Sequence, residues 1–577
     1  MKSKLRTYMN GYWHMVIIGI IGMCCEVFCE LRLPDIAGNI YDIGVNGDGG
    51  KEYVIKWGLL MLLTAFIGMC GGLVCMKTSA IASQGFAYKL RSALFDKIST
   101  FSFKNIDTFS TASLTTRLTN DVTMLQNIIM MSLRMLVRAP ALIIISAFYI
   151  LTINPQMSLI VVAILPIIVV AVLIILKFGF PMFQKMQKRI DNVNRVVQEN
   201  LIGIRVVKAY VRQDHEKEKF KDASDALARQ GAKAAGLIVT AMPLMMLIFN
   251  AAIVFVYWKG GNNINDGTMT VGELTKFSNY LMQILMSLVM VSMILIMVGR
   301  AKACSDRVKE VLDTDIDVKE KEKTLSGDGK GKVEFRNVSF RYSTETSGDN
   351  ILENISFTAN PGEIIGIVGG TGCGKSSMVN LIPRLYDVTS GQVLIDGVDV
   401  RDYDIKKLRD MIGVVLQKNV LFSGTIRDNI RWGKEDATDE EIVAACKSAQ
   451  ADDFIRRQPD GYDTNLAQGG LNLSGGQKQR LCIARAIIKQ PKILILDDST
   501  SAVDSATEAK IRESFYNELK DTTVFIIAQR VSSVQNADRI LVMDDGEIKG
   551  SGTHDELLKS NEIYQEIYKT QQKGVSE

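Results

Sequence analysis

The C-terminal half of the chain contains the glycine-rich sequence Gly369-Gly-Thr-Gly-Cys-Gly-Lys375-Ser376. It matches the pattern G-x-x-x-x-G-K-[ST] in full, follows a short apolar run at 364–368 and precedes an apolar helical pattern at 378–385. This order is typical of a phosphate-binding loop, because glycines let backbone N–H groups surround a phosphate and the helix N-terminus adds positive charge. Lys375 would reach the β- and γ-phosphates, and Ser376 would ligate Mg²⁺. The predicted nucleotide-binding residues of this loop are Gly369, Thr371, Gly372, Cys373, Gly374, Lys375, Ser376 and Ser377.

A second strand is predicted at 492–497, which reads Lys-Ile-Leu-Ile-Leu-Asp. Its almost continuous apolar character is typical of a strand buried on both faces of a parallel sheet. Asp497 stands at the carboxyl end of this strand, where doubly wound sheets bind their ligands. We therefore predict that Asp497 joins Ser376 as a Mg²⁺ ligand.

The N-terminal half has a different composition, with six apolar segments of about 20 residues, the length that crosses a bilayer. They lie near 12–33, 57–76, 133–153, 157–178, 236–258 and 278–298. The whole chain has 577 residues and a net charge of +4 from 67 basic and 63 acidic residues, which gives no case for a nucleic-acid partner. The nine cysteines fit no zinc or disulfide framework.

Basic residues set the predicted orientation of these segments. They precede the first segment and are dense between segments two and three and between segments four and five, whereas the opposite loops hold few. By the positive-inside rule this places both termini in the cytoplasm of a multi-pass protein of the cell membrane. The two basic stretches show helical periodicity, so we expect them to extend the spanning helices, with transverse segments near 106–121 and 202–212. A separate helical hairpin on the lipid headgroups is the alternative.

Polar and flexible residues also occur at membrane depth. Glu26 and Glu30 share one helix face, and ionisable groups there are functional candidates, although packing or a hydrated cavity would also explain them. The last segment carries a methionine stripe, which suits either a binding wall or simple packing. The stripe comprises Met282, Met286, Met290, Met293 and Met297.

A charged, glycine-containing stretch separates the two halves and is typical of a linker. We predict a transmembrane domain at 1–318, a linker at 319–332 and a nucleotide-binding domain at 333–577. The predicted fold class is an all-α membrane domain of six transmembrane helices with long cytoplasmic extensions. An α/β phosphate-loop ATPase domain with a helical subdomain follows it.

The motif Leu473-Ser474-Gly475-Gly476-Gln477 resembles the signature of the ATP-binding-cassette (ABC) ATPases. Tyr342 resembles the aromatic residue that stacks on adenine in that family, and Ser501-Ala-Val-Asp504 resembles the loop after the second strand. Gln417 resembles the glutamine between the catalytic core and the helical subdomain, which implies catalytic and Mg²⁺-binding roles. The whole chain resembles a half-transporter of the exporter type. The resemblance implies ATP and Mg²⁺ as cofactors, and a dimer that sandwiches ATP between the phosphate loop of one chain and Ser474, Gly475, Gly476 and Gln477 of the other.

Three residues depart from the family pattern. Asp498 stands where the family usually has the glutamate that activates water, Gln529 replaces the switch histidine, and Gln468 replaces a glutamate before the signature. These departures predict an ATP site that binds nucleotide and hydrolyses it slowly. They resemble the degenerate-site subunit of bacterial heterodimeric multidrug exporters, whose partner half-transporter supplies the glutamate and histidine. A homodimer with two slow sites, or an Asp498 that serves adequately as base, remains open.

The resemblance therefore predicts a translocase that exports amphipathic or hydrophobic molecules, drugs or lipids, across the lipid bilayer at the expense of ATP. The alternatives are a peptide or lipid exporter that works as a homodimer, and an ATP-gated membrane sensor.

Overall fold

The computed structural model describes residues 5–318, 325, 327, 329–342, 350–499 and 503–573. The chain forms two compact units. One unit contains Met1–Ser99 and Thr111–Thr314 and is helical, whereas the other contains Thr100–Ser110 and Asp315–Glu577 and holds the sheets. Ser501 and Ala502 of the predicted loop, and most of the predicted linker at 319–332, lie outside the described residues.

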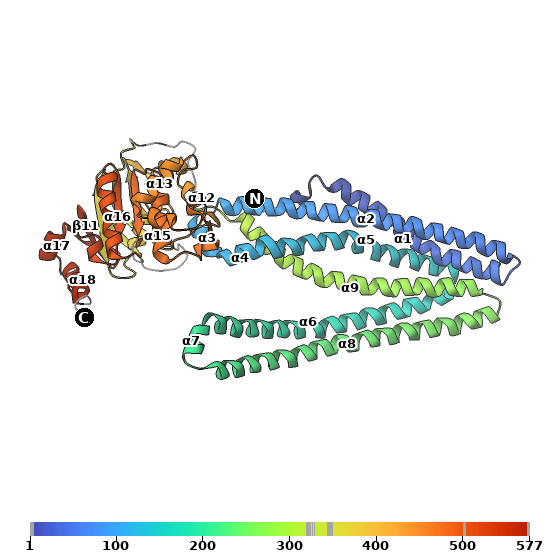
Figure 1. Cartoon of the computed structure of the whole chain (residues 1–577). Coiled ribbons are helices and arrows are strands. Elements are labelled where there is room, and N and C mark those ends of the chain that lie inside the picture. The colour runs from blue at the N-terminus through green and yellow to red at the C-terminus, as the bar shows by residue number, and fades with distance from the viewer. Residues whose placement is uncertain are drawn as a thin grey trace. The chain divides into compact units, whose positions relative to one another are not determined.

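The helical unit consists mainly of long helices. They are α1 (Trp13–Asn39), α2 (Gly50–Ser99), α5 (Val122–Ile153), α6 (Pro155–Ile202), α8 (Gln213–Asn265) and α9 (Val271–Asp313). At 50 residues, α2 is about 75 Å long, far more than the roughly 30 Å of a bilayer core. The short helices are α4 (Thr111–Thr116) and α7 (Ile204–Ala209), and α7 lies at the turn between α6 and α8 (Figure 1). The predicted helical extensions and the second transverse segment are therefore present.

Five helices in the described part of the chain are long and apolar enough to cross a membrane. They occupy Gly50–Ser99, Thr111–Ile153, Pro155–Ile202, Pro243–Asn265 and Val271–Val291. The first predicted segment also forms a helix, α1, but it is not among the five. The described residues therefore contain five candidate spans, by length and composition, where the sequence predicted six.

Close helix packing in this unit depends on glycine. The helix α1 packs on α2 and α5, α5 packs on α9, and α6 pairs with α8 (Figure 1). A Cβ atom on Gly22 of α1 would lie 2.8 Å from the carbonyl oxygen of Gly71 on α2, and a Cβ atom on Gly71 would lie 2.8 Å from that of Gly22. The two backbones are thus in direct contact, and a side chain at either position would separate them.

The second unit is built on a six-stranded sheet with the order β12-β11-β3-β10-β9-β6. The five strands from β11 to β6 are parallel, and β12 runs antiparallel at the edge. These strands are β3 (Ile364–Gly369), β6 (Ile412–Val415), β9 (Ile493–Asp497), β10 (Thr523–Ile527), β11 (Arg539–Asp544) and β12 (Glu547–Gly552). An antiparallel sheet, β2-β1-β4-β5, and a short pair, β7-β8, complete the unit. Their strands are β1 (Val333–Phe340), β2 (Leu352–Ala359), β4 (Ser390–Ile395), β5 (Val398–Asp399), β7 (Gly424–Thr425) and β8 (Asn465–Leu466).

Helices cover the sheets of this unit. They are α3 (Phe103–Phe109), α10 (Lys375–Asn380), α11 (Ile405–Asp410), α12 (Ile426–Arg431), α13 (Asp439–Ser448), α14 (Asp452–Arg456), α15 (Gly475–Ile487), α16 (Ser505–Glu518), α17 (His554–Ser560) and α18 (Glu562–Lys573). The first of these comes from the N-terminal part of the chain and belongs to the unit that holds the sheets. It overlaps the predicted transverse segment 106–121 only at 106–109, and residues 111–121 of that segment belong to the helical unit.

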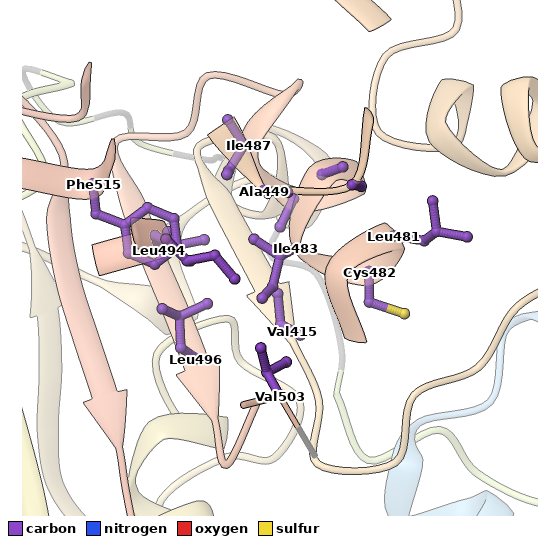
Figure 2. Packing of buried hydrophobic residues seen from close by; sticks show 14 of the residues in the cluster. Val415, Ala449, Leu481, Cys482, Ile483, Ile487, Leu494, Leu496, Val503 and Phe515 are labelled. Carbon is purple, nitrogen blue, oxygen red and sulfur yellow. The ribbon is translucent and has the colours of Figure 1, made fainter. Parts of the chain in front are cut away.

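Strand β9 is buried on both faces, as its apolar sequence predicted. Leu494 and Leu496 join one hydrophobic core, which Figure 2 shows around Ile483 and Phe515 of the covering helices. Ile493 and Ile495 point to the other core, on the opposite face of the sheet. The strand is therefore held from both sides, and this fixes the position of the acidic residues at its carboxyl end.

Candidate nucleotide site

The predicted phosphate-binding loop connects β3 to α10. Two of its glycines lie so close to neighbouring atoms that a side chain would not fit. A Cβ atom on Gly369 would lie 2.1 Å from the carbonyl oxygen of Met543. Gly374 has a φ of +95° and stands directly before α10, where a Cβ atom would lie 2.7 Å from Leu352. Any larger residue at these two positions would push the loop away from the sheet. Thr371 and Gly372 are exposed, so the rim of the loop is open to a ligand.

The ammonium group of Lys375 lies over this loop. Its Nζ donates hydrogen bonds to the carbonyl oxygens of Gly369 at 3.0 Å and Gly370 at 2.6 Å. It also lies 3.6 Å from the sulfur of Cys373. The positive charge is therefore placed at the loop that the sequence predicted to bind phosphate.

Ser376 and Asp497 are brought together as the sequence predicted. The hydroxyl of Ser376 donates to Oδ1 of Asp497 at 2.9 Å. Burial raises the pKa of Asp497 above its usual range, while the hydrogen bond from Ser376 opposes this shift. One hydroxyl and one carboxylate fit Mg²⁺ in a phosphate site, because this ion takes one or two carboxylates and completes its shell with phosphate and water oxygens.

The three predicted catalytic residues meet at the ends of neighbouring parallel strands. Asp498 follows β9, Gln529 follows β10 and Gln417 follows β6, and these three strands are adjacent in the sheet. The side chain of Gln529 donates from Nε2 to Oδ2 of Asp498 at 2.8 Å, and Gln417 also hydrogen-bonds this carboxyl group. Gln417 is thus hydrogen-bonded to Asp498, the neighbour of the predicted Mg²⁺ ligand Asp497.

Asp498 is held in an uncommon environment. Its φ is +49°, in the left-handed region that non-glycine residues rarely adopt, and such strain concentrates at functional sites. Burial raises the pKa of its carboxyl group, and the hydrogen bonds from Gln417 and Gln529 oppose this shift. The carboxylate is therefore held by two amides beside the phosphate loop.

Tyr342 stands beside the loop with 37% of its surface exposed. Its hydroxyl and that of Ser377 are 2.9 Å apart. Its ring packs edge-on against Phe340 and Tyr386, with centroids 4.9 Å and 5.0 Å away. The ring therefore stands beside the loop, and its stacking on adenine stays a prediction.

The signature motif begins α15 with a reciprocal cap. The backbone N–H of Ser474 donates to Oε1 of Gln477 at 2.9 Å, and the hydroxyl of Ser474 accepts from the backbone N–H of Gln477 at 3.4 Å. Ser474 and Gly475 are exposed, and so is Gln468 upstream. This helix packs against α12 and α13, whereas α10 packs against β3 and β10. The signature thus lies on a different set of elements from the loop.

One contact of this unit was not predicted from the sequence. The hydroxyl of Tyr386 donates to Oδ2 of Asp107 in α3 at 2.8 Å, and Phe103 packs on the Tyr386 ring at 6.1 Å. Burial, followed by the bond to Asp107, raises the pKa of Tyr386. The residue that packs on Tyr342 is therefore also the residue that holds the transverse helix.

The methionine stripe of the helical unit is only partly described. Met282 and Met286 are 36% and 55% exposed, whereas Ile284 and Leu285 between them are buried. The side chain of Met293 lies outside the described residues. The first two methionines therefore lie on the outer face of α9, and their role in binding stays a prediction.

Comparison with known proteins now decides the family. Residues 16–288 match the ABC transporter transmembrane region, and residues 352–501 match the ABC transporter domain. The ABC transporter ATP-binding protein YfiB of Bacillus subtilis is 41% identical over 99% of this chain and 98% of its own length. The chain belongs to the ABC transporter family.

Two further relatives describe this ABC transporter more closely. An ATP-dependent lipid A-core flippase of Desulfotalea psychrophila is 38% identical over 69% of each chain. The structure of a bacterial Atm1-family ABC exporter with ATP bound matches 98% of this chain and 99% of that one, with a TM-score of 0.80 and 27% identity. The protein is thus an exporter-type half-transporter with a membrane domain fused to an ABC ATPase, and this ATPase domain implies ATP binding.

Proposed function

We propose that this chain is one half of an ATP-driven exporter of amphipathic or hydrophobic molecules, drugs or lipids, in the cell membrane, with both termini in the cytoplasm. The fold shared with an Atm1-family exporter supports export, and the flippase relative supports an amphipathic cargo. The basic residues of the extended helices support the orientation. In this proposal the membrane domain has six crossings, with α1 as the first.

The second half of the exporter is another polypeptide. Lys375 in the phosphate loop and Ser474 in the signature are both accessible at the surface of the unit. A helix start with free N–H groups is an anion site, so Ser474, Gly475 and Gly476 would face the γ-phosphate held by the partner chain. Each nucleotide is then shared by two chains, and ATP binding draws the two cassettes together.

The observation that carries the impaired-site proposal is the environment of Asp498. Its carboxylate is one methylene shorter than the usual glutamate and is set back by roughly 1.5 Å. Gln529 can donate a hydrogen bond to a phosphate but cannot carry a positive charge. A misplacement of about 1 Å can lower the rate about 10²-fold. ATP binding is expected to persist because the loop, Ser376 and Asp497 are intact.

In this proposal each residue of the nucleotide site has its own role in the transport cycle. Lys375 and the loop N–H groups hold the phosphates, Ser376 and Asp497 hold Mg²⁺, and Tyr342 stacks on adenine. Movement of the cassette is passed to the helices through α3, which Tyr386 holds by its hydrogen bond to Asp107. A partner site with glutamate and histidine, completed by the signature of this chain, hydrolyses ATP and resets the pair.

Two measurements test the assembly and the site. A tagged chain purified from its native membrane should bring down a different half-transporter that carries the missing glutamate and histidine. Recovery of a second copy of this chain instead would support the homodimer. The chain purified alone should bind ATP and release phosphate slowly; brisk turnover would reject the impaired site.

Transport is tested with the two-chain complex in lipid vesicles. ATP-dependent uptake of a fluorescent amphiphile into inside-out vesicles is expected, and Lys375→Ala should weaken nucleotide binding at this chain's own site. Nucleotide-dependent conformational change without uptake of any amphiphile would favour the sensor.

A further inference from the structure

A cavity of about 430 Å³ lies in the membrane domain among α1, α2 and α5, which pack side by side (Figure 1). Four charged side chains line it, namely Glu26, Glu30, Arg134 and Arg138. Its remaining wall is largely apolar and includes Met69 and Leu73 of α2. The volume is within the range of small-molecule sites, and its mixture of polar and apolar walls suits an amphiphile.

Arg138 forms ion pairs with both glutamates. Its Nη1 donates to Oε1 of Glu26 at 2.6 Å, and its Nη2 donates to Oε2 of Glu30 at 2.8 Å. The Nε atom of Arg138 is buried and has no hydrogen-bond partner in the described part of the chain. The three side chains together carry a net charge of −1, because one guanidinium faces two carboxylates.

Glycine lets this cluster reach the wall of α2. A Cβ atom on Gly72 would lie 2.8 Å from Oε2 of Glu26. Oε1 of the same carboxylate binds Arg138, so Oε2 is the oxygen turned toward α2. The Glu26 carboxylate therefore occupies space that exists only because position 72 has no side chain.

Arg134 is the counterpart of this anionic cluster. It lies one helical turn before Arg138 on α5, is exposed and lines the same cavity. The described hydrogen bonds and ion pairs of the two glutamates are made by Arg138 and do not include Arg134. The cavity thus presents the positive charge of Arg134 beside a cluster of Arg138 and two glutamates whose net charge is −1.

We infer that this cavity binds the headgroup of a zwitterionic amphiphile that has a phosphate and a primary ammonium group. The phosphate pairs with Arg134, the ammonium group pairs with Glu26 and Glu30, and the chain of the amphiphile lies along Met69 and Leu73. The inference rests on the proposed export function and names the substrate class for it. A headgroup with only negative charge would face the two glutamates, and one with only positive charge would face Arg134.

The position of the cluster supports a functional site. Glu26, Glu30 and Arg138 lie within segments that the sequence predicted to cross the membrane, where an ionisable group is costly unless it faces a hydrated cavity or a partner, and Arg134 lies at the start of one of these segments. Arg138 satisfies the glutamates, but this ion pair does not account for Arg134. A zwitterionic headgroup would satisfy every charge that lines the cavity at once.

The test measures equilibrium binding of palmitoyl lysolipids to the purified two-chain complex without nucleotide. Lysophosphatidylethanolamine should bind about tenfold more tightly than lysophosphatidylglycerol, because close charge pairs are worth at least this factor. Lysophosphatidylcholine, which has no N–H donor, should bind more weakly than lysophosphatidylethanolamine. Equal affinities for the three would overturn the inference.

Variants of the protein test the phosphate contact and the ammonium contact of the headgroup separately. Arg134→Gln should weaken both the ethanolamine and the glycerol lipid about tenfold, whereas Glu26→Gln should weaken only the ethanolamine lipid. Gly72→Ala retains every charge and displaces the Glu26 carboxylate, so it should reproduce the effect of Glu26→Gln. Arg32→Gln removes a cation of α1 that does not line the cavity, and it should leave all three affinities unchanged.

An unchanged thermal unfolding midpoint of each variant complex shows that the helical unit is folded, and retained ATP binding shows the same for the unit that holds the sheets. Weakening of all lipids to the same degree by Glu26→Gln would reject the ammonium contact. Because binding is measured without nucleotide, the inference fails separately from export: ATP-dependent uptake of another amphiphile, without selectivity for the ethanolamine lipid, would leave export standing and reject this site.

Discussion

Replacing Asp498 by glutamate and Gln529 by histidine, the residues usual in the family, should increase ATP hydrolysis by this chain in the absence of its proposed partner. The double variant Asp498→Glu, Gln529→His extends the carboxylate by one methylene and replaces the amide that now donates to Asp498 at 2.8 Å. The other parts of the site are already present, since Ser376 lies 2.9 Å from Asp497 and Lys375 lies over the loop. The perturbation therefore changes only the groups proposed to position and activate water.

The expected gain follows from the geometry. The added methylene advances the carboxylate by roughly 1.5 Å. A displacement of about 1 Å corresponds to about 10²-fold in rate, which is about 2.7 kcal/mol in the activation free energy. Glutamate is less suited than aspartate to the φ of +49° at position 498, so the free energy of unfolding should fall by about 1 kcal/mol.

Phosphate release by two copies of the chain assembled together in lipid nanodiscs is the assay, because each proposed site needs the signature of a second chain, and thermal unfolding is measured in parallel. The matched control is Asp498→Gln with Gln529→His, which has the length of glutamate without its charge, and it should show no gain. Lys375→Ala added to the active variant should return turnover to background. If the glutamate variant binds ATP normally and hydrolyses it no faster than the glutamine variant, the impaired-site reasoning is refuted.

Three other changes have defined outcomes. Gly476→Glu in the two-chain complex should abolish phosphate release at the partner's site, by placing a carboxylate beside the γ-phosphate, while this chain still binds ATP; normal turnover would contradict the cross-chain assignment. Tyr386→Phe removes the hydrogen bond to Asp107 and should lower the free energy of unfolding by about 1 kcal/mol, measured by denaturant unfolding with Asp107→Asn as comparison. Gly369→Ala should abolish ATP binding in a filter assay, because its Cβ would lie 2.1 Å from the carbonyl oxygen of Met543; unchanged affinity would show that the loop adapts.

Features made of contiguous residues could be predicted without coordinates. The loop from Gly369 to Ser376 needs only a few neighbouring residues of the right type, and local backbone chemistry then specifies its shape. The position of Asp497 also followed from the strand pattern, because a strand apolar on both faces is central in a parallel sheet.

The number of membrane-spanning helices predicted from hydropathy differs from the number of candidate spans in the structure. Hydropathy predicted six, whereas five helices of the described chain meet the requirements of length and apolar character. The predicted segment that is not among the five is α1, and this helix contains two charged residues, Glu26 and Glu30.

Contacts between distant segments were decided only by the tertiary structure. Tyr386 and Asp107 are 279 positions apart, and Arg138 is 112 positions from Glu26, so no local pattern could pair them. The glutamates were visible in the sequence as candidates, but their cation and the cavity around it were not. Local sequence specifies what a residue can do chemically, whereas the packing of helices and strands decides which partner comes within bonding distance.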